Sequence, residues 1–235
     1  MELSREWLCR QLAELAEPEL AAFNRKLIPE ASCAVYGVRV PKVRALARSV
    51  ARTPGWQALA DAIPADAALE ELYVKGMTVG YARMSWPERW ARILAFVPLI
   101  TNWAVCDCCC STYTAVRREQ AAAWPDVLRH ADSAREFDQR FAAVMLMDHF
   151  LTPDRLPDVL RVLAAIRPSG YYAAMGVGWA FSACFVHAPE ATWAVLQSGD
   201  VAGESRRLAC RKILESRRTS PEWRAVVRGA KGAGL

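Results

Sequence analysis

The chain has 235 residues, of which 53% are hydrophobic, so it is long enough for one sizeable core or for an extended array of small units. No run of about 18 uncharged apolar residues occurs, and Met1–Arg10 carries charges in place of an apolar signal segment, so we expect a soluble, cytoplasmic protein with no membrane partner. The formal net charge of +5 is a modest basic excess, compatible with a polyanionic partner without requiring one.

The sequence contains eight cysteines, four of which lie within five positions, at Cys106, Cys108, Cys109 and Cys110. Neighbours this close do not easily form disulfides with one another, and a cytosolic environment keeps thiols reduced. Metal sites usually draw their ligands from separated segments, and no second cysteine or histidine pair is present. We therefore expect small buried apolar side chains at these positions, with no metal and no cofactor.

Helical periodicity with short connections accounts for nearly the whole chain, and no alternating run bounded by hairpin signals is found. The pattern predicts an all-α protein. The expected helices are Leu3–Leu15, Pro18–Leu27 (stopped by Ile28–Pro29), Pro41–Val50, Gln57–Ile63, Ala67–Tyr81, Pro87–Val97, Asn102–Thr114, Glu119–His130, Ser133–Phe150, Leu156–Ile166, Tyr171–Val186, Glu190–Gln197, Glu204–Ser216 and Pro221–Arg228.

Helix pairs recur at intervals of roughly 35 to 40 residues, which is the period of helical repeats. Such pairs bury their apolar faces by stacking, and a stacked array has a concave inner surface that fits a long rigid partner such as duplex DNA. We expect a single repeat domain over residues 1–235. A compact helical bundle is the competing architecture, because short loops occur in both.

The stretch Asn102–Asp107 places a tryptophan and an acid four residues apart at the start of an apolar run. On a helix, Trp103 and Asp107 then project from the same face. An aromatic face beside an anion is suited to a flat cation. The alternative is structural: Asn102 caps the helix, Trp103 packs in the core and Asp107 is a solvated acid of the first turn.

Basic residues gather in two segments of the chain. A basic helix face is usually just solvated, so each cluster alone is weak evidence for phosphate contact. The two clusters are Arg39, Lys42, Arg44 and Arg48, and Arg206, Arg207, Arg211, Lys212, Arg217 and Arg218.

Four segments occur in the order typical of one known family. They are Tyr36–Arg44, Asn102–Asp107, Gln139–Leu146 and Met175–Ala180. In these segments the chain resembles the AlkD-like DNA alkylation repair proteins. The resemblance implies a right-handed superhelical array of HEAT-like repeats with a concave basic cleft, and double-stranded DNA as the partner.

The resemblance also implies roles for individual residues. Trp103 and Asp107 match the first tryptophan and the aspartate of the family's catalytic site, and Trp179 matches its second tryptophan. Arg140 matches an arginine that contacts the DNA backbone beside the lesion, although it could also be an ordinary surface arginine within reach of Glu136. We expect Arg39, Lys42 and Arg44 to add DNA contacts.

The implied activity is that of a monofunctional DNA glycosylase, a hydrolase of N-glycosyl bonds that excises cationic N3- and N7-alkylpurines without base flipping. The segment Ala16–Pro29 departs from the active glycosylases and is closer to a paralogous branch that lacks the substrate-recognition helix. The alternative function is therefore a non-catalytic protein that uses the same cleft to bind alkylated or branched DNA. A helical scaffold for protein partners is a third option, and in each case we expect a monomer, associated with the nucleoid if DNA is bound.

Overall fold

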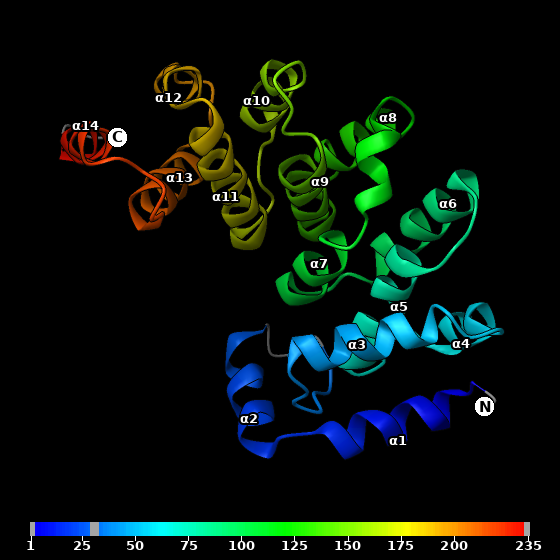
Figure 1. Cartoon of the computed structure of the whole chain (residues 1–235). Coiled ribbons are helices and arrows are strands. Elements are labelled where there is room, and N and C mark those ends of the chain that lie inside the picture. Colours follow the sequence, from blue (N-terminus) through cyan, green and yellow to red (C-terminus); the bar gives the residue numbers. More distant parts are fainter. Residues whose placement is uncertain (1–2, 29–32, 233–235) are drawn as a thin grey trace. The chain divides into compact units, whose positions relative to one another are not determined.

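The computed structural model describes residues 3–28 and 33–232, and this part of the chain contains fourteen α-helices and no strand. The chain forms two compact units, Met1–Val116 and Arg117–Leu235. The first unit contains α1 (Arg5–Leu15), α2 (Pro18–Leu27), α3 (Val40–Val50), α4 (Trp56–Ala62), α5 (Leu69–Tyr81), α6 (Trp86–Phe96) and α7 (Trp103–Cys110). The second contains α8 (Gln120–Ala131), α9 (Glu136–His149), α10 (Leu156–Ala165), α11 (Tyr171–His187), α12 (Pro189–Gln197), α13 (Gly203–Glu215) and α14 (Pro221–Gly232) (Figure 1).

The prediction of an all-α protein is confirmed, and each predicted helix has its counterpart. A single repeat domain, the right-handed superhelix and its concave cleft stay predictions. Of the residues predicted to stop α2, Ile28 follows the helix directly, whereas Pro29 lies outside the described residues.

The predicted end of α7 at Thr114 is wrong, because the helix ends at Cys110. The hydroxyl groups of Ser111 and Thr112 donate hydrogen bonds to the carbonyls of Cys108 and Cys109 over 2.9 and 2.7 Å. Serine and threonine hydroxyls compete in this way with the backbone donors that would continue a helix. A short 3-10 helix, Thr114–Arg118, follows.

In the first unit, α5 packs against both α3 and α7. Gly76 lets α5 approach its neighbours closely, since a Cβ atom there would lie 2.5 Å from the sulfur of Cys109 and 2.7 Å from the ring of Phe96. At the start of α5, the Glu71 carboxylate accepts a hydrogen bond from Arg5 over 2.8 Å. This contact ties α1 to the same central helix.

In the second unit, α11 is the central helix, packed against α9 on one side and α13 on the other. A Cβ atom at Gly176 would lie 3.1 Å from Cγ of Arg140 on α9, and one at Gly178 would lie 2.8 Å from Cβ of Leu208 on α13. The two glycines therefore set the spacing of three helices.

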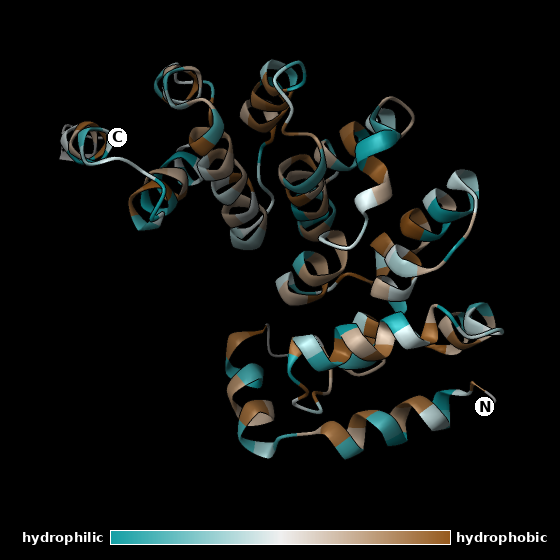
Figure 2. Ribbon diagram, viewed as in Figure 1, coloured by the Kyte–Doolittle hydropathy of each residue, from teal (hydrophilic) through white to brown (hydrophobic). Residues whose placement is uncertain are grey.

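The peripheral helices are amphipathic, in keeping with the spacing of their apolar residues. Figure 2 shows brown and teal segments alternating along α1 and α2. Leu8 and Leu12 supply the fully buried face of α1. No helix in residues 3–28 and 33–232 has the length and apolarity needed to cross a bilayer.

Gly178→Ala should destabilise the protein by about 1–3 kcal/mol, because the added methyl group meets Leu208 and the backbone of Ala209. Gly229→Ala on α14 is the matched control, since a Cβ atom at that position would have no other atom within 4 Å. There the substitution should stabilise by about 0.5–1 kcal/mol. Urea unfolding followed by circular dichroism measures both, and equal midpoints would contradict the close approach of α11 and α13.

Candidate functional site

The residues that begin α7 form one stripe along the helix. Asn102 caps α7, its side-chain oxygen accepting a hydrogen bond from the backbone N–H of Val105 over 3.0 Å. Trp103, Asp107 and Ser111 follow at intervals of four residues and so share one face, here called the α7 stripe. Trp103 and Asp107 are both partly exposed. Of the structural alternative, the cap is confirmed, whereas a core position for Trp103 and a first-turn position for Asp107 are wrong.

The indole of Trp103 is anchored at its edge. Its Nε1–H donates a hydrogen bond to the carbonyl of Leu27, the last residue of α2, over 2.8 Å. Phe23 lies one turn earlier on the same face of α2 and is 57% exposed. An exposed aromatic side chain of the N-terminal helices therefore lies one turn before the carbonyl that binds Trp103.

Arg44 connects three helices beside the α7 stripe. One guanidinium nitrogen donates to the hydroxyl of Tyr81 over 3.2 Å, and the other donates to Ser111 Oγ over 2.9 Å. Ser111 lies one turn after Asp107. The partly buried Arg44 thus places a positive charge at the C-terminal end of α7, where the helix dipole is negative.

Arg39 and Lys42 are exposed, but each has an acidic partner. Both form ion pairs with Glu17, over 2.8 and 3.3 Å. The hydrogen bond from Arg39 is the main cause that lowers the pKa of Glu17, so this carboxylate stays charged at neutral pH. Two of the three predicted DNA contacts in this segment are therefore partly neutralised by α2.

The cysteines of α7 behave as apolar side chains. Cys106, Cys109 and Cys110 are fully buried. Burial raises the pKa of Cys108 to about 11, opposed by the charge of Arg44 and assisted by that of Asp107. A protonated thiol is a poor nucleophile. Within the described residues, no group of three or more His, Cys, Asp or Glu side chains is arranged to hold a metal ion.

Trp179 belongs to the second unit and is 37% exposed on α11. Gly178 faces Leu208, and Met175 meets the guanidinium of Arg211 at 3.9 Å, so α11 and α13 run antiparallel at this contact. Trp179 lies one turn after Met175. This register places Trp179 level with Arg207 along the two helices. Arg207 and Arg211 form ion pairs with Glu204 and Glu215 of the same helix, over 3.3 and 3.7 Å.

Arg140 is also in the second unit, and only 3% of its surface is exposed. Its guanidinium donates a hydrogen bond to the carbonyl of Tyr172 over 2.8 Å, and its side chain packs on Gly176. The alternative that Arg140 is an ordinary surface arginine is therefore wrong. Its contact with DNA stays a prediction.

The segment before α3 is held by a buried acid. The carboxylate of Glu70 on α5 accepts hydrogen bonds from the backbone N–H groups of Tyr36, Gly37 and Val38, over 2.9, 2.8 and 3.1 Å. Gly37 has a φ of +84°, and a Cβ atom there would lie 2.5 Å from the backbone of α2. Glycine is therefore required where α2 meets the segment that leads into α3.

Sequence reasoning missed Glu17, Phe23 and Glu70. Two adjacent acids, Glu70 and Glu71, at the otherwise apolar start of α5 are a signal that could have indicated Glu70 as a buried acceptor. The pairing of Glu17 with residues more than 20 positions away left no local signal.

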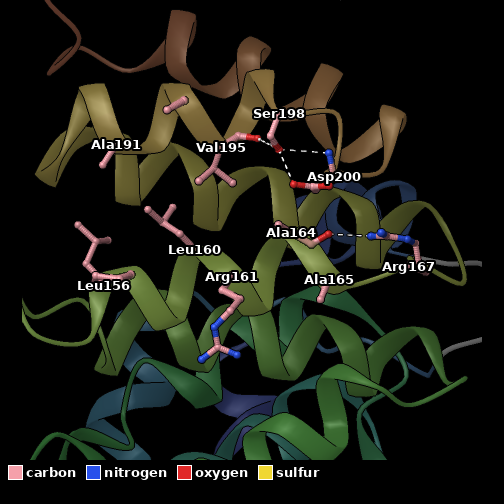
Figure 3. Close-up of a pocket in the computed structure, with 12 residues that line it drawn as sticks. Leu156, Leu160, Arg161, Ala164, Ala165, Arg167, Ala191, Val195, Ser198 and Asp200 are labelled. Atoms are coloured by element: carbon pink, nitrogen blue, oxygen red, sulfur yellow. Dashed lines mark hydrogen bonds between the residues drawn. The ribbon is translucent and has the colours of Figure 1, made fainter.

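A groove of about 720 Å³ lies between α10 and α12 in the second unit. Figure 3 shows Leu156, Leu160 and Ala164 facing Ala191 and Val195 across it. Arg167 lies at its edge, with its guanidinium bound to the carbonyl of Ala164. The groove is mainly apolar and contains none of the predicted site residues.

Comparison with known protein families gives a match over most of the chain. A family described as DNA alkylation repair enzyme matches residues 8–213. Neither the comparison with curated proteins nor that with solved structures finds a match. The matched range contains every predicted site residue.

Glu70→Gln should destabilise the protein by about 2 kcal/mol, because an amide group replaces one of the two carboxylate oxygens that accept the three buried N–H groups. Glu14→Gln is the matched control in the same unit, as Glu14 is exposed, and its effect should stay within about 0.5 kcal/mol. Denaturant unfolding measures both free energies. Equal values for the two variants would show that Glu70 does not hold the segment.

Proposed function

This chain belongs to the DNA alkylation repair enzyme family, and on that basis we propose that it is a DNA-binding, monofunctional glycosylase for cationic N3- and N7-alkylpurines. Family membership supports a role in DNA alkylation repair with DNA as the substrate class. The observation that carries the glycosylase proposal is the α7 stripe, on which the partly exposed Trp103 and Asp107 share one face.

The chemistry of a cationic base suits a carboxylate. An alkylated purine that already carries positive charge is a good leaving group, so no strong general acid is needed. As the glycosidic bond breaks, positive charge moves to the deoxyribose, and a fixed carboxylate stabilises the transition state more than the ground state. Asp107 supplies this field and positions the attacking water, which leaves an abasic site and the free base.

Trp103 and Trp179 interact with the sugar and backbone through their ring faces, which favour a cation. The hydrogen bond from Trp103 to Leu27 fixes the indole before the substrate binds, so the side chain loses little conformational entropy on binding. The lesion is then read from the backbone side, and the base need not enter a tight pocket.

The exposed Phe23 supports the enzyme over a non-catalytic DNA-binding protein. A recognition element needs an aromatic side chain on the N-terminal helices, and α2 provides one a turn before the carbonyl that binds Trp103. The composition of Ala16–Pro29 supports the alternative, a paralogue that binds alkylated or branched DNA without excision. A catalytic assay decides between the two.

Contacts with the DNA backbone are assigned to both units. In the first unit, Arg39 and Lys42 release Glu17 and contact phosphates in its place. Arg44, which lies beside the α7 stripe, contacts a further phosphate. In the second unit, Arg140 keeps its proposed backbone contact. Phosphate contacts of this kind make binding fall steeply with salt.

Asp107→Asn should lower the release of 7-methylguanine and 3-methyladenine from methylated duplex DNA by about 10²–10³-fold, because the developing positive charge loses its counterion. DNA binding should change little. Chromatography of the released bases under single-turnover conditions measures the rate, with DNA lacking protein as the baseline for spontaneous loss. Asp66→Asn, which removes an exposed acid from the same unit, is the matched control and should behave as the wild type.

Release that is equal in Asp107→Asn and wild type would remove Asp107 from the mechanism. Binding of DNA by the wild type without any release would support the non-catalytic alternative.

Glu17→Gln should raise the affinity for duplex DNA severalfold at low salt, because it frees Arg39 and Lys42 from their shared partner. The slope of log K against log salt concentration should also steepen. Glu19→Gln removes the same charge from the same helix, where Glu19 is exposed and forms no ion pair within the described residues. Fluorescence anisotropy titrations measure both, and equal affinities for the two variants would exclude Arg39 and Lys42 as contacts.

A further inference from the structure

An open cavity of about 720 Å³ lies beyond the C-terminal end of α3 in the first unit. Its polar lining includes Arg52, Gln57, Tyr81 and Arg83. No carboxylate of the described residues lines it. Both arginines are exposed, so the cavity offers two guanidinium groups to a ligand in solvent.

Two further arginines converge on the same tyrosine. The guanidinium carbon of Arg48 lies 4.9 Å from the centroid of the Tyr81 ring, and Arg44 donates a hydrogen bond to the Tyr81 hydroxyl. Arg44, Arg48 and Arg52 follow at intervals of four residues and so form one row down α3 and past its end. Like charges in such a row repel one another, so the row is costly unless an anion offsets it.

The outer members of this group have no acidic partner. Within residues 3–28 and 33–232, Arg48, Arg52 and Arg83 form no ion pair. Arg92, whose guanidinium lies over the ring of Trp56, forms ion pairs with Asp61 at 3.1 Å and with Glu88 at 3.4 Å. These two acids are therefore paired with an arginine outside the cavity. The cavity therefore keeps its full positive charge.

We propose that this cavity, here called the α3-end pocket, binds a phosphate group of the DNA backbone away from the damaged base. Planar guanidinium groups bind phosphate oxygens in pairs and with directed geometry. The inference rests on the proposed DNA-binding function and adds a contact that base excision does not use.

The row leads away from the α7 stripe. Arg44 is bound to Ser111, one turn after Asp107, whereas Arg52 lies eight residues further along the chain, two residues past the end of α3. The α3-end pocket therefore lies apart from Asp107, and the phosphate that it holds differs from the one beside the damaged base.

The test replaces the two lining arginines in the full chain with Arg52→Gln and Arg83→Gln together. Affinity for an undamaged, fluorescently labelled duplex is measured by anisotropy over a series of salt concentrations. Each neutralised phosphate contributes about one to the slope of log K against log salt, so the double variant, which loses this one phosphate, should lose about one. At low salt its affinity should fall by about 10–100-fold.

The matched control is Arg10→Gln with Arg228→Gln. Both residues are exposed, neither lines the cavity, and the pair removes the same charge. Its slope should equal that of the wild type. Arg52→Lys with Arg83→Lys keeps the charge and should recover most of the slope, which separates lost phosphate contacts from altered folding.

The outcomes separate this inference from the proposed function. A wild type that binds no duplex DNA would overturn the DNA-binding proposal itself. Binding by the wild type, with the Arg52 and Arg83 double variant matching the control pair, would overturn only the α3-end pocket. That second outcome would leave an acidic protein as the remaining class of partner for its arginines.

Discussion

The buried carboxylate of Glu70 is the constraint on which the first unit depends. It accepts the three consecutive N–H groups of residues 36–38, which would otherwise be buried without partners at a cost of about 1–3 kcal/mol each. The same short segment contains Gly37, whose carbonyl accepts a hydrogen bond from Glu17 at the start of α2. One side chain on α5 therefore sets the places of both α2 and α3.

The candidate catalytic stripe on α7 follows from that arrangement. Because α2 is held against Gly37, its last carbonyl reaches the indole of Trp103. Because α3 is held at its start, Arg44 reaches Ser111 at the other end of α7. Trp103 and Asp107 thus lie between two fixed contacts, and the site is built on helices whose positions are set before any substrate binds.

The second unit achieves the same rigidity with glycines in place of an acid. Gly176 and Gly178 bring α9 and α13 close to α11, and the apolar interior is continuous through Phe181 and Phe185. Trp179 follows Gly178 directly and remains partly exposed. Arg207 and Arg211 on α13 are paired with Glu204 and Glu215, so the charge of these two arginines is partly offset within their own helix.

The sequence by itself determined the number and order of the helices, although not the end of α7, together with the Asn102 cap and the shared face of Trp103 and Asp107. Each of these depends on residues within one or two turns of one another. The family is likewise shown by the sequence, which matches it over residues 8–213. Only the tertiary structure decided that Glu17 neutralises Arg39 and Lys42, that Arg140 is buried, and that Arg48, Arg52 and Arg83 form no ion pair within the described part of the chain. Those outcomes depend on which side chains from distant segments come within about 4 Å of one another. The periodicity of the sequence contains no information on distances between segments.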